Sequence, residues 1–130
     1  MIVVDASVVL EVLLATPDSL PLQNRLFATK QSLHAPHLLD LEVAQVLRRY
    51  FLSGRLTAER GATALEYLSG FPITRYPHDA LLPRVWELRH NFTAYDAAYL
   101  ALAEALNAPL LTRDRALATA GGHTAEVELV

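Results

Sequence analysis

The chain contains no cysteine among its 130 residues. This absence excludes disulfide bonds, cysteine-ligated zinc, iron–sulfur clusters and a thiol nucleophile. Any metal site must therefore use other ligands, and here the acidic side chains can supply oxygen. The lack of cysteine is also typical of a reducing compartment, and we expect a cytoplasmic protein.

Long hydrophobic runs and a strong net charge are also missing. No apolar stretch reaches the roughly 20 residues of a transmembrane helix. The apolar start, MIVVDASVVLEVLLA, has no basic residue and is interrupted by Asp5 and Glu11, unlike a signal peptide. We therefore expect no membrane partner. The formal charge of -3 gives no basic field for nucleic acid, and an apolar content of 52% excludes a disordered chain. The length predicts one domain, residues 1–130.

Three classes of phosphate-handling protein are excluded, two of them because glycine and lysine are scarce. Among five glycines only Gly121 and Gly122 are adjacent, so no glycine-rich phosphate loop is present. The only lysine, Lys30, comes too early for the late-strand lysine of a receiver domain. The segment Asp5-Ala6-Ser7 lacks the second aspartate of a haloacid-dehalogenase-type phosphatase.

Apolar periodicity predicts short strands that alternate with helices. We expect strands at 1–4, 33–35, 72–76, 109–112 and 126–130, and helices at 7–15, 20–29, 38–52, 57–69, 79–89, 93–106 and 114–119. This alternation predicts an α/β fold with a parallel sheet covered on both faces.

Four acids occupy similar places in this pattern. Asp5 and Asp114 follow strands, while Glu42 and Asp96 lie in the expected first turns of two helices. In such folds ligands bind outside the carboxyl ends of the strands, so the four carboxylates converge if the strands are neighbours. Clustered carboxylates repel one another unless a cation lies between them. Oxygen ligands suit Mg²⁺ or Mn²⁺, and such ions activate water for phosphoryl chemistry.

Each acid alone also has a purely structural interpretation. Asp5 and Asp114 can be helix N-caps, and Glu42 is favoured near a helix start by the helix dipole. Asp96 lies three residues after Thr93, at capping-box spacing. The four together favour a cation site over four separate caps.

The segments that carry these acids read IVVDASV, HLLDLEVAQVL, FTAYDAAYLALA and LLTRDRAL. In order and spacing, over the whole chain, they resemble the PIN-domain family, in particular VapC-type toxins of type II VapBC toxin–antitoxin systems. The resemblance implies a three-layer α/β/α sandwich with a small central parallel sheet. It also implies a Mg²⁺- or Mn²⁺-dependent endoribonuclease, a hydrolase that inhibits translation and growth.

The motif match assigns the catalytic and metal-binding roles to Asp5, Glu42, Asp96 and Asp114. Glu42 would be a further ligand or a base that positions water. An activated water would attack the scissile phosphate in line and leave a 5′-phosphate and a 3′-hydroxyl. Ser7 and Thr112 match supporting positions, although Ser7 also suits a helix cap and Thr112 a β-branched strand residue. The five histidines form no recognisable pair by spacing, and we expect none of them to be catalytic.

The resemblance also implies partners. They are an RNA substrate, a second copy of the chain, and a cognate VapB-like antitoxin that forms a heterotetramer or larger complex and blocks the site. The early helices are rich in apolar side chains, and we predict a groove on the first four helices that takes an amphipathic helix. These side chains are Val8, Val9, Val12, Leu13, Leu14, Leu22, Leu26 and Phe51.

Arginine is the residue type we expect to contact RNA, since ten of the eleven basic residues are arginines. They cluster at Arg48, Arg49, Arg55 and Arg60, and at Arg84 and Arg89. The alternative interpretation is that these arginines only form solvated faces of helices.

A catalytically inactive PIN-fold binding module, acting through protein or RNA contacts, is the alternative function. The presence of all four acids argues against it. The net charge does not exclude RNA, because without those four acids the formal charge would be +1. A cation between the acids would leave the cleft near neutral or positive, so we expect RNA binding to depend on the metal.

Overall fold

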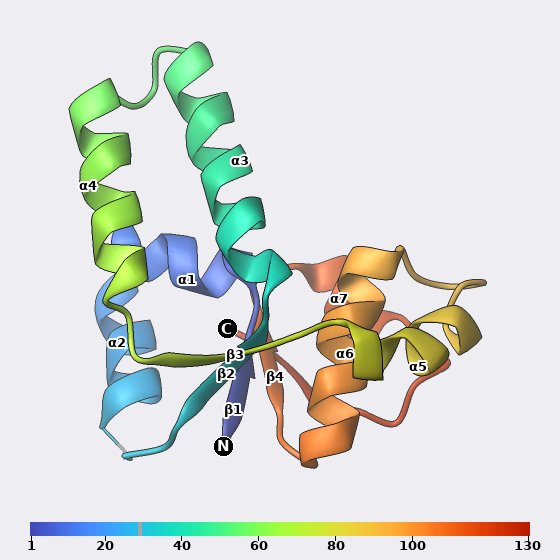
Figure 1. Ribbon diagram of the computed structural model, residues 1–130. Coiled ribbons are helices and arrows are strands. Elements are labelled where there is room, and N and C mark those ends of the chain that lie inside the picture. Colours follow the sequence, from blue (N-terminus) through green and yellow to red (C-terminus); the bar gives the residue numbers. More distant parts are fainter. Residues whose placement is uncertain (29) are drawn as a thin grey trace.

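Five parallel strands form the centre of the protein in a computed structural model that describes residues 1–28 and 30–130 (Figure 1). They are β1 (Ile2–Val4), β2 (Leu33–Pro36), β3 (Ile73–Tyr76), β4 (Leu110–Thr112) and β5 (Val127–Leu129), in the spatial order β3-β2-β1-β4-β5. Every neighbouring pair is parallel. All three β1 residues are fully buried, as expected of a central strand covered on both faces.

Helices cover both faces of the sheet, which confirms the predicted α/β/α sandwich (Figure 1). One side carries α1 (Ala6–Leu13), α2 (Ser19–Phe27), α3 (Leu38–Leu52) and α4 (Ala58–Ser69), and the other carries α5 (Leu82–Glu87) and α6 (Ala94–Leu106). The short helix α7 (Arg115–Thr119) links β4 to β5. Helices α3 and α4 form a hairpin that projects beyond the sheet. No helix in the described ranges is long and apolar enough to cross a membrane.

The predicted helix at 79–89 is wrong as a single element. The chain instead forms a 3₁₀ turn, η1 (Asp79–Leu81), followed by α5, which ends at Glu87. Pro83 lies at the start of α5. Because proline has no N–H to donate, it is tolerated in a first helical turn but interrupts a longer helix. Several other boundaries differ by one or two residues. For example, α1 ends at Leu13 rather than Ala15, and β2 includes Pro36. The predicted end of the second helix, Thr29, lies outside the described residues.

Alanines fix the position of α6 against the sheet. Ala97, Ala98 and Ala101 are almost fully buried, and α6 packs on β1 and β2. Small side chains let a helix approach a sheet closely, so the start of α6 has a defined position at the sheet edge.

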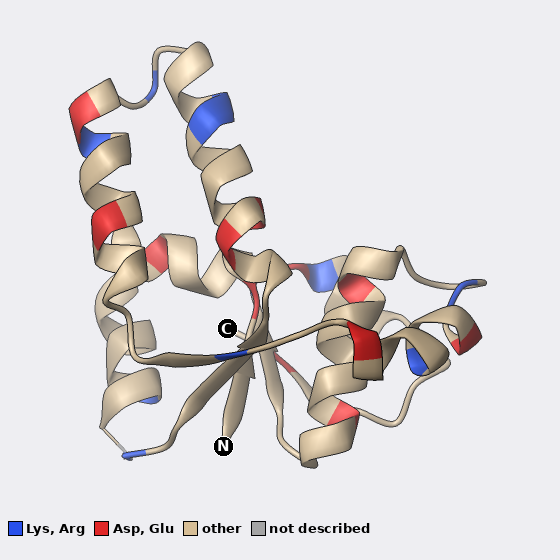
Figure 2. Cartoon of the chain, in the orientation of Figure 1, with Lys and Arg blue, Asp and Glu red and all other residues tan. Residues whose placement is uncertain are grey.

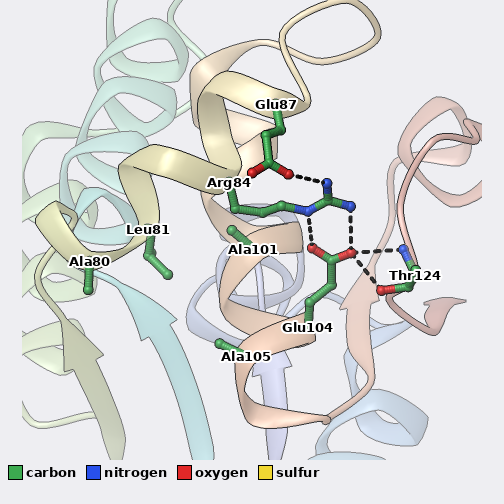
Figure 3. A pocket seen from close by; sticks show the side chains of 8 residues that line it. All are labelled: Ala80, Leu81, Arg84, Glu87, Ala101, Glu104, Ala105 and Thr124. Atoms are coloured by element: carbon green, nitrogen blue, oxygen red, sulfur yellow. Dashed lines mark hydrogen bonds and ion pairs between the residues drawn. The ribbon is translucent and has the colours of Figure 1, made fainter.

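The carboxylate of Glu104 ties α6 to α5 and to the segment before β5 (Figure 3). Arg84 donates to both carboxylate oxygens, at 2.8 and 3.0 Å, and the backbone N–H and hydroxyl of Thr124 donate to Oε2 at 2.8 and 2.7 Å. These bonds, Arg84 first, lower the pKa of Glu104 to about 2. These bonds therefore stabilise the fold fully at pH values above 4.5, the ordinary pKa of a glutamate. This stabilisation is lost as the pH falls toward 2.

We expect Glu104→Gln to lower the free energy of unfolding at neutral pH by about 1–3 kcal/mol, because charged hydrogen bonds are lost. The matched control is Glu87→Gln, since Glu87 pairs with the same Arg84 but its side chain is 63% exposed. This control should cost about 0.5 kcal/mol or less. Urea unfolding of the three proteins tests the difference, and equal effects would contradict it.

Candidate functional site

Strands β1 and β4 mark the place where the chain changes direction across the sheet. From β1 the chain adds β2 and β3 on one side, then returns to add β4 and β5 on the other. The crevice at such a switch point, outside the carboxyl ends of the strands, is where ligands bind in open α/β sheets. Acidic segments gather at this edge, around the starts of α3 and α6 (Figure 2).

Asp5 lies at the centre of this edge and is only 7% exposed. Its Oδ1 accepts bonds from the backbone N–H of Val8, at 3.2 Å, and from the hydroxyl of Ser7, while Thr112 Oγ1 donates to Oδ2. Asp5 is therefore the N-cap of α1, and the alternative of Ser7 as the cap is wrong. Burial raises the pKa of Asp5 above 3.8, against these hydrogen bonds, which lower it.

Ser7 and Thr112 also hold the loop that follows β4. The backbone N–H of Arg113 donates to Ser7 Oγ at 2.9 Å, and that of Asp114 donates to Thr112 Oγ1 at 3.0 Å. Asp114 caps α7 as predicted, since its Oδ1 accepts from the N–H groups of Ala116 and Leu117 at 2.9 and 3.4 Å. The two hydroxyl residues thus connect the ends of β1 and β4.

Glu42 lies in the second turn of α3, so its predicted place in the first turn is wrong. The acid in the first turn is Asp40, which pairs with Arg75 of β3 at 2.9 Å. Since α3 begins at Leu38, Glu42 comes one full turn later. Its Oε1 accepts a 2.6 Å hydrogen bond from the hydroxyl of Tyr99. Burial raises the pKa of Glu42, and the charges of Asp5 and Asp96 raise it further.

Asp96 lies in the first turn of α6, as predicted. Its backbone N–H donates to Thr93 Oγ1 at 3.1 Å, which is the Thr93 half of the capping box. Its carboxylate accepts no hydrogen bond from the part of the chain that the structure describes. Burial raises the pKa of Asp96, and the neighbouring charges of Asp114 and Asp5 add to this effect.

The structure brings the four acids into one electrostatic neighbourhood, because Asp5 and Asp96 each perturb Glu42 and Asp114 perturbs Asp96. None of the four forms an ion pair within residues 1–28 and 30–130. Their carboxylates do not yet meet at one point. Among the described residues, no group of three or more His, Asp or Glu side chains is close enough together to hold an ion. Uncompensated carboxylates are nevertheless the donors that a hard divalent cation prefers, and Mg²⁺ keeps several waters between itself and such ligands.

The histidines serve other purposes. Nε2 of His78 accepts from the backbone N–H of Leu38 at 2.9 Å, at the start of α3, and His34 bonds Ser32 and Tyr76. The rings of His37 and His78 lie edge to face at 6.0 Å, a pairing that sequence spacing did not indicate. Within the described chain no histidine is hydrogen-bonded to the four acids.

Tyr99 is the residue at this site to which sequence reasoning gave no role. It is only 2% exposed, and its hydroxyl bonds Glu42, which is 57 positions away. A usable signal was present, because Tyr99 and Asp96 are three residues apart and share a helix face. A buried tyrosine hydroxyl also needs a polar partner.

We expect Tyr99→Phe to raise the pKa of Glu42 further in the metal-free protein, because the hydrogen bond that lowers it is removed. The ring is kept, so the fold should persist. Carbon-13 NMR titration of the glutamate side chains measures the change. Tyr67→Phe, on an exposed tyrosine of α4, is the control. An unchanged or lowered pKa in Tyr99→Phe would contradict the assigned role of this bond.

Comparison with known proteins places these features in a family. Residues 2–122 match the model of the PIN domain. VapC ribonuclease Mb0985 of Mycobacterium bovis is 46% identical over 121 residues, covering 93% of this chain and 91% of that protein. Ribonuclease VapC1 of Mycobacterium tuberculosis is 45% identical over 129 residues, covering 98% and 96%.

Solved structures agree on the fold. VapBC2 from Rickettsia felis, bound to a DNA fragment from its promoter, superposes with a TM-score of 0.71 at 17% identity, covering 99% of this chain and 98% of that one. The Mycobacterium tuberculosis toxin VapC20, which cleaves the sarcin-ricin loop, gives 0.66 at 18% identity over 93% and 97% of the two chains.

Proposed function

The chain belongs to the PIN-domain family, and we propose that it is the VapC-type ribonuclease toxin of a VapBC toxin–antitoxin system. The observation that carries the proposal is the gathering of Asp5, Glu42, Asp96 and Asp114 around the switch point of the sheet. Each belongs to one of the four segments that resemble the family. The curated ribonucleases of this family match the chain over nearly its full length.

We propose that Asp5, Asp96 and Asp114 hold one or more Mg²⁺ or Mn²⁺ ions, with Glu42 as a further ligand or as a base that orients water. The bound cation would activate water and offset charge on the phosphoryl oxygens of the scissile bond. Two observations support this proposal: the donor set is all oxygen, and none of these acids forms an ion pair with a basic residue in the described part of the chain.

The other residues of the site would hold the acids in place. Ser7 and Thr112 each donate to one oxygen of Asp5 and so fix the plane of its carboxylate. Tyr99 donates to Oε1 of Glu42, and Oε2, which accepts no hydrogen bond from the described residues, would be available to a ligand or a water. In the metal-free protein, burial raises the pKa of Glu42 and so makes it a stronger proton acceptor than an exposed glutamate.

The partner proposals are an RNA substrate, a VapB-like antitoxin and a second copy of the chain. A groove of about 270 Å³ runs between the end of α1 and α4, lined by Leu13, Leu14 and Tyr67 among others, and we propose it as the seat of an amphipathic antitoxin helix. The apolar early helices give less support than predicted. Val8, Val9, Leu22 and Leu26 are core residues, whereas Phe51 is half exposed.

The experiment that tests the function is induction of the protein in a bacterial host, followed by sequencing of RNA 5′ ends. We expect growth arrest and new fragments that begin with a 5′-phosphate, and we expect both to be suppressed by a co-expressed antitoxin. Growth arrest without any RNA cleavage would instead favour the catalytically inactive binding module.

A further inference from the structure

An apolar hollow adjoins the four acids on the outer face of α3. It encloses about 600 Å³, the size range of small-ligand sites. Its lining, which we call the α3 hollow, consists of Leu38, Leu41, Glu42, Ala44, Gln45, Arg48 and Tyr95. Glu42 belongs to the candidate site itself, and Tyr95 directly precedes Asp96. The hollow is therefore continuous with the place where the scissile phosphate would lie.

The exposed apolar side chains in this hollow come from the same helix starts as the acids. Tyr95 is 65% exposed and Leu41 is 76% exposed, next in sequence to Asp96 and Glu42. Successive helical residues point about 100° apart, so each helix directs one acid toward the site and one large apolar group beside it. Because the ring of Tyr95 is exposed, it is not part of the core, and a nucleic-acid base can stack on it.

The hollow also contains the positively charged side chain of Arg48. Arg48 lies six residues after Glu42 on α3, which is roughly 9 Å along the helix axis. No acid in the described chain forms an ion pair with Arg48. A free guanidinium at this distance from the acids can bind a phosphate next to the one being cut.

We propose that the α3 hollow binds a nucleotide that flanks the cleaved bond of single-stranded RNA, with its base stacked on Tyr95 and its phosphate held by Arg48. This inference rests on the proposed ribonuclease function and adds a subsite to it. Single-stranded RNA suits the hollow because its bases are free to leave their neighbours and stack on protein rings. A second copy of the chain is a weaker occupant, because protein interface cores are depleted in charge and this hollow contains both Glu42 and Arg48.

The stacking contact is tested by RNA binding with all four acids present and Ca²⁺ in place of Mg²⁺, so that a hard cation can occupy the site while the RNA should stay intact. The probes are a fluorescein-labelled oligoadenylate of about 12 nucleotides and an abasic ribose-phosphate oligomer of equal length. We expect Tyr95→Ala to weaken binding of oligoadenylate about 10- to 100-fold and to leave the abasic oligomer almost unaffected. Tyr95→Phe should bind like the parent, and so should the control Trp86→Ala, which alters an exposed aromatic residue of α5 outside the hollow.

The phosphate contact is tested through salt dependence. Arg48→Ala should reduce the slope of log binding constant against log salt by about 0.7, the value for one contact on a single strand. Lys30→Ala, which alters an exposed basic residue outside the hollow, should leave the slope unchanged.

Other outcomes would overturn the proposal. Equal losses for the two probes, or a loss in Tyr95→Phe, would exclude stacking. Dissociation of a dimer by Tyr95→Ala, seen by light scattering, would make the hollow an interface between copies. If RNA is cleaved by the unmodified protein but Tyr95→Ala binds oligoadenylate normally, only the subsite fails. If the protein neither binds nor cleaves RNA, the ribonuclease function fails with it.

Discussion

Replacing Asp96 by asparagine should abolish RNA cleavage and at the same time stabilise the metal-free protein at neutral pH. The carboxylate of Asp96 is half-buried beside Asp5 and Asp114, and these surroundings raise its pKa. A charged Asp96 is therefore unfavourable in the folded protein, and the neutral amide removes that cost. Loss of a ligand should reduce cleavage by more than the roughly 10- to 100-fold typical of residues that only orient a ligand.

The opposite signs of the two effects separate function from folding. A variant that had merely misfolded would lose activity and stability together. Cleavage of a labelled RNA gives the first quantity, and thermal unfolding in EDTA gives the second. Glu66→Gln, on the exposed face of α4, is the control and should change neither. An active Asp96→Asn protein would remove Asp96 from the site, and an inactive but destabilised one would contradict the electrostatic argument.

Chelation should have an equally large effect: EDTA should stop RNA cleavage, and Mg²⁺ or Mn²⁺ should restore it. The same addition should stabilise the fold, because a ligand that binds only the folded state at 100 times its dissociation constant adds about 2.7 kcal/mol. Thermal unfolding with and without MgCl₂ measures this gain. In a protein carrying both Asp5→Asn and Asp96→Asn, the gain should disappear.

The pH dependence of the metal-free protein follows from Asp5, Glu42 and Asp96. Burial is the main cause that raises the pKa of Asp5 and Asp96 above 3.8 and of Glu42 above 4.5. Groups with raised pKa values stabilise the fold fully below their ordinary values, and this contribution is lost as the pH rises through the raised values. We expect stability in EDTA to fall, relative to the double variant, as the pH rises above about 4, and Mg²⁺ to reverse the fall. Cleavage in EDTA with no Mg²⁺ effect on unfolding would refute the cation site.

The fold could be predicted from the sequence because its signals are local. The run Ile2-Val3-Val4 marks a buried strand, and Thr57 and Thr93 cap the helices that follow them. Pro83 was a further local signal, and it explains the break that the prediction at 79–89 missed. The identity of the four acids came from their motifs, and their placement near one edge of the sheet from the rule for parallel sheets.

The contacts that orient those acids could not be predicted from the sequence, because they join residues that are distant in the chain. Thr112 bonds Asp5 across 107 positions, and Tyr99 bonds Glu42 across 57. The periodicity of a single helix or strand carries no information on such pairs. Only the strand order, with β4 beside β1, brings Thr112 to Asp5.

The same strand order directs the amino ends of α1, α3 and α6 toward one edge of the sheet. Each helix dipole places about half a positive charge at its amino end. In the metal-free protein these partial charges offset part of the repulsion among the acids. If the proposed cations neutralised the carboxylates, the dipoles would remain as a net positive field at the same edge. That field would attract a polyanion such as RNA only with the metal in place, and the metal-free protein would repel it.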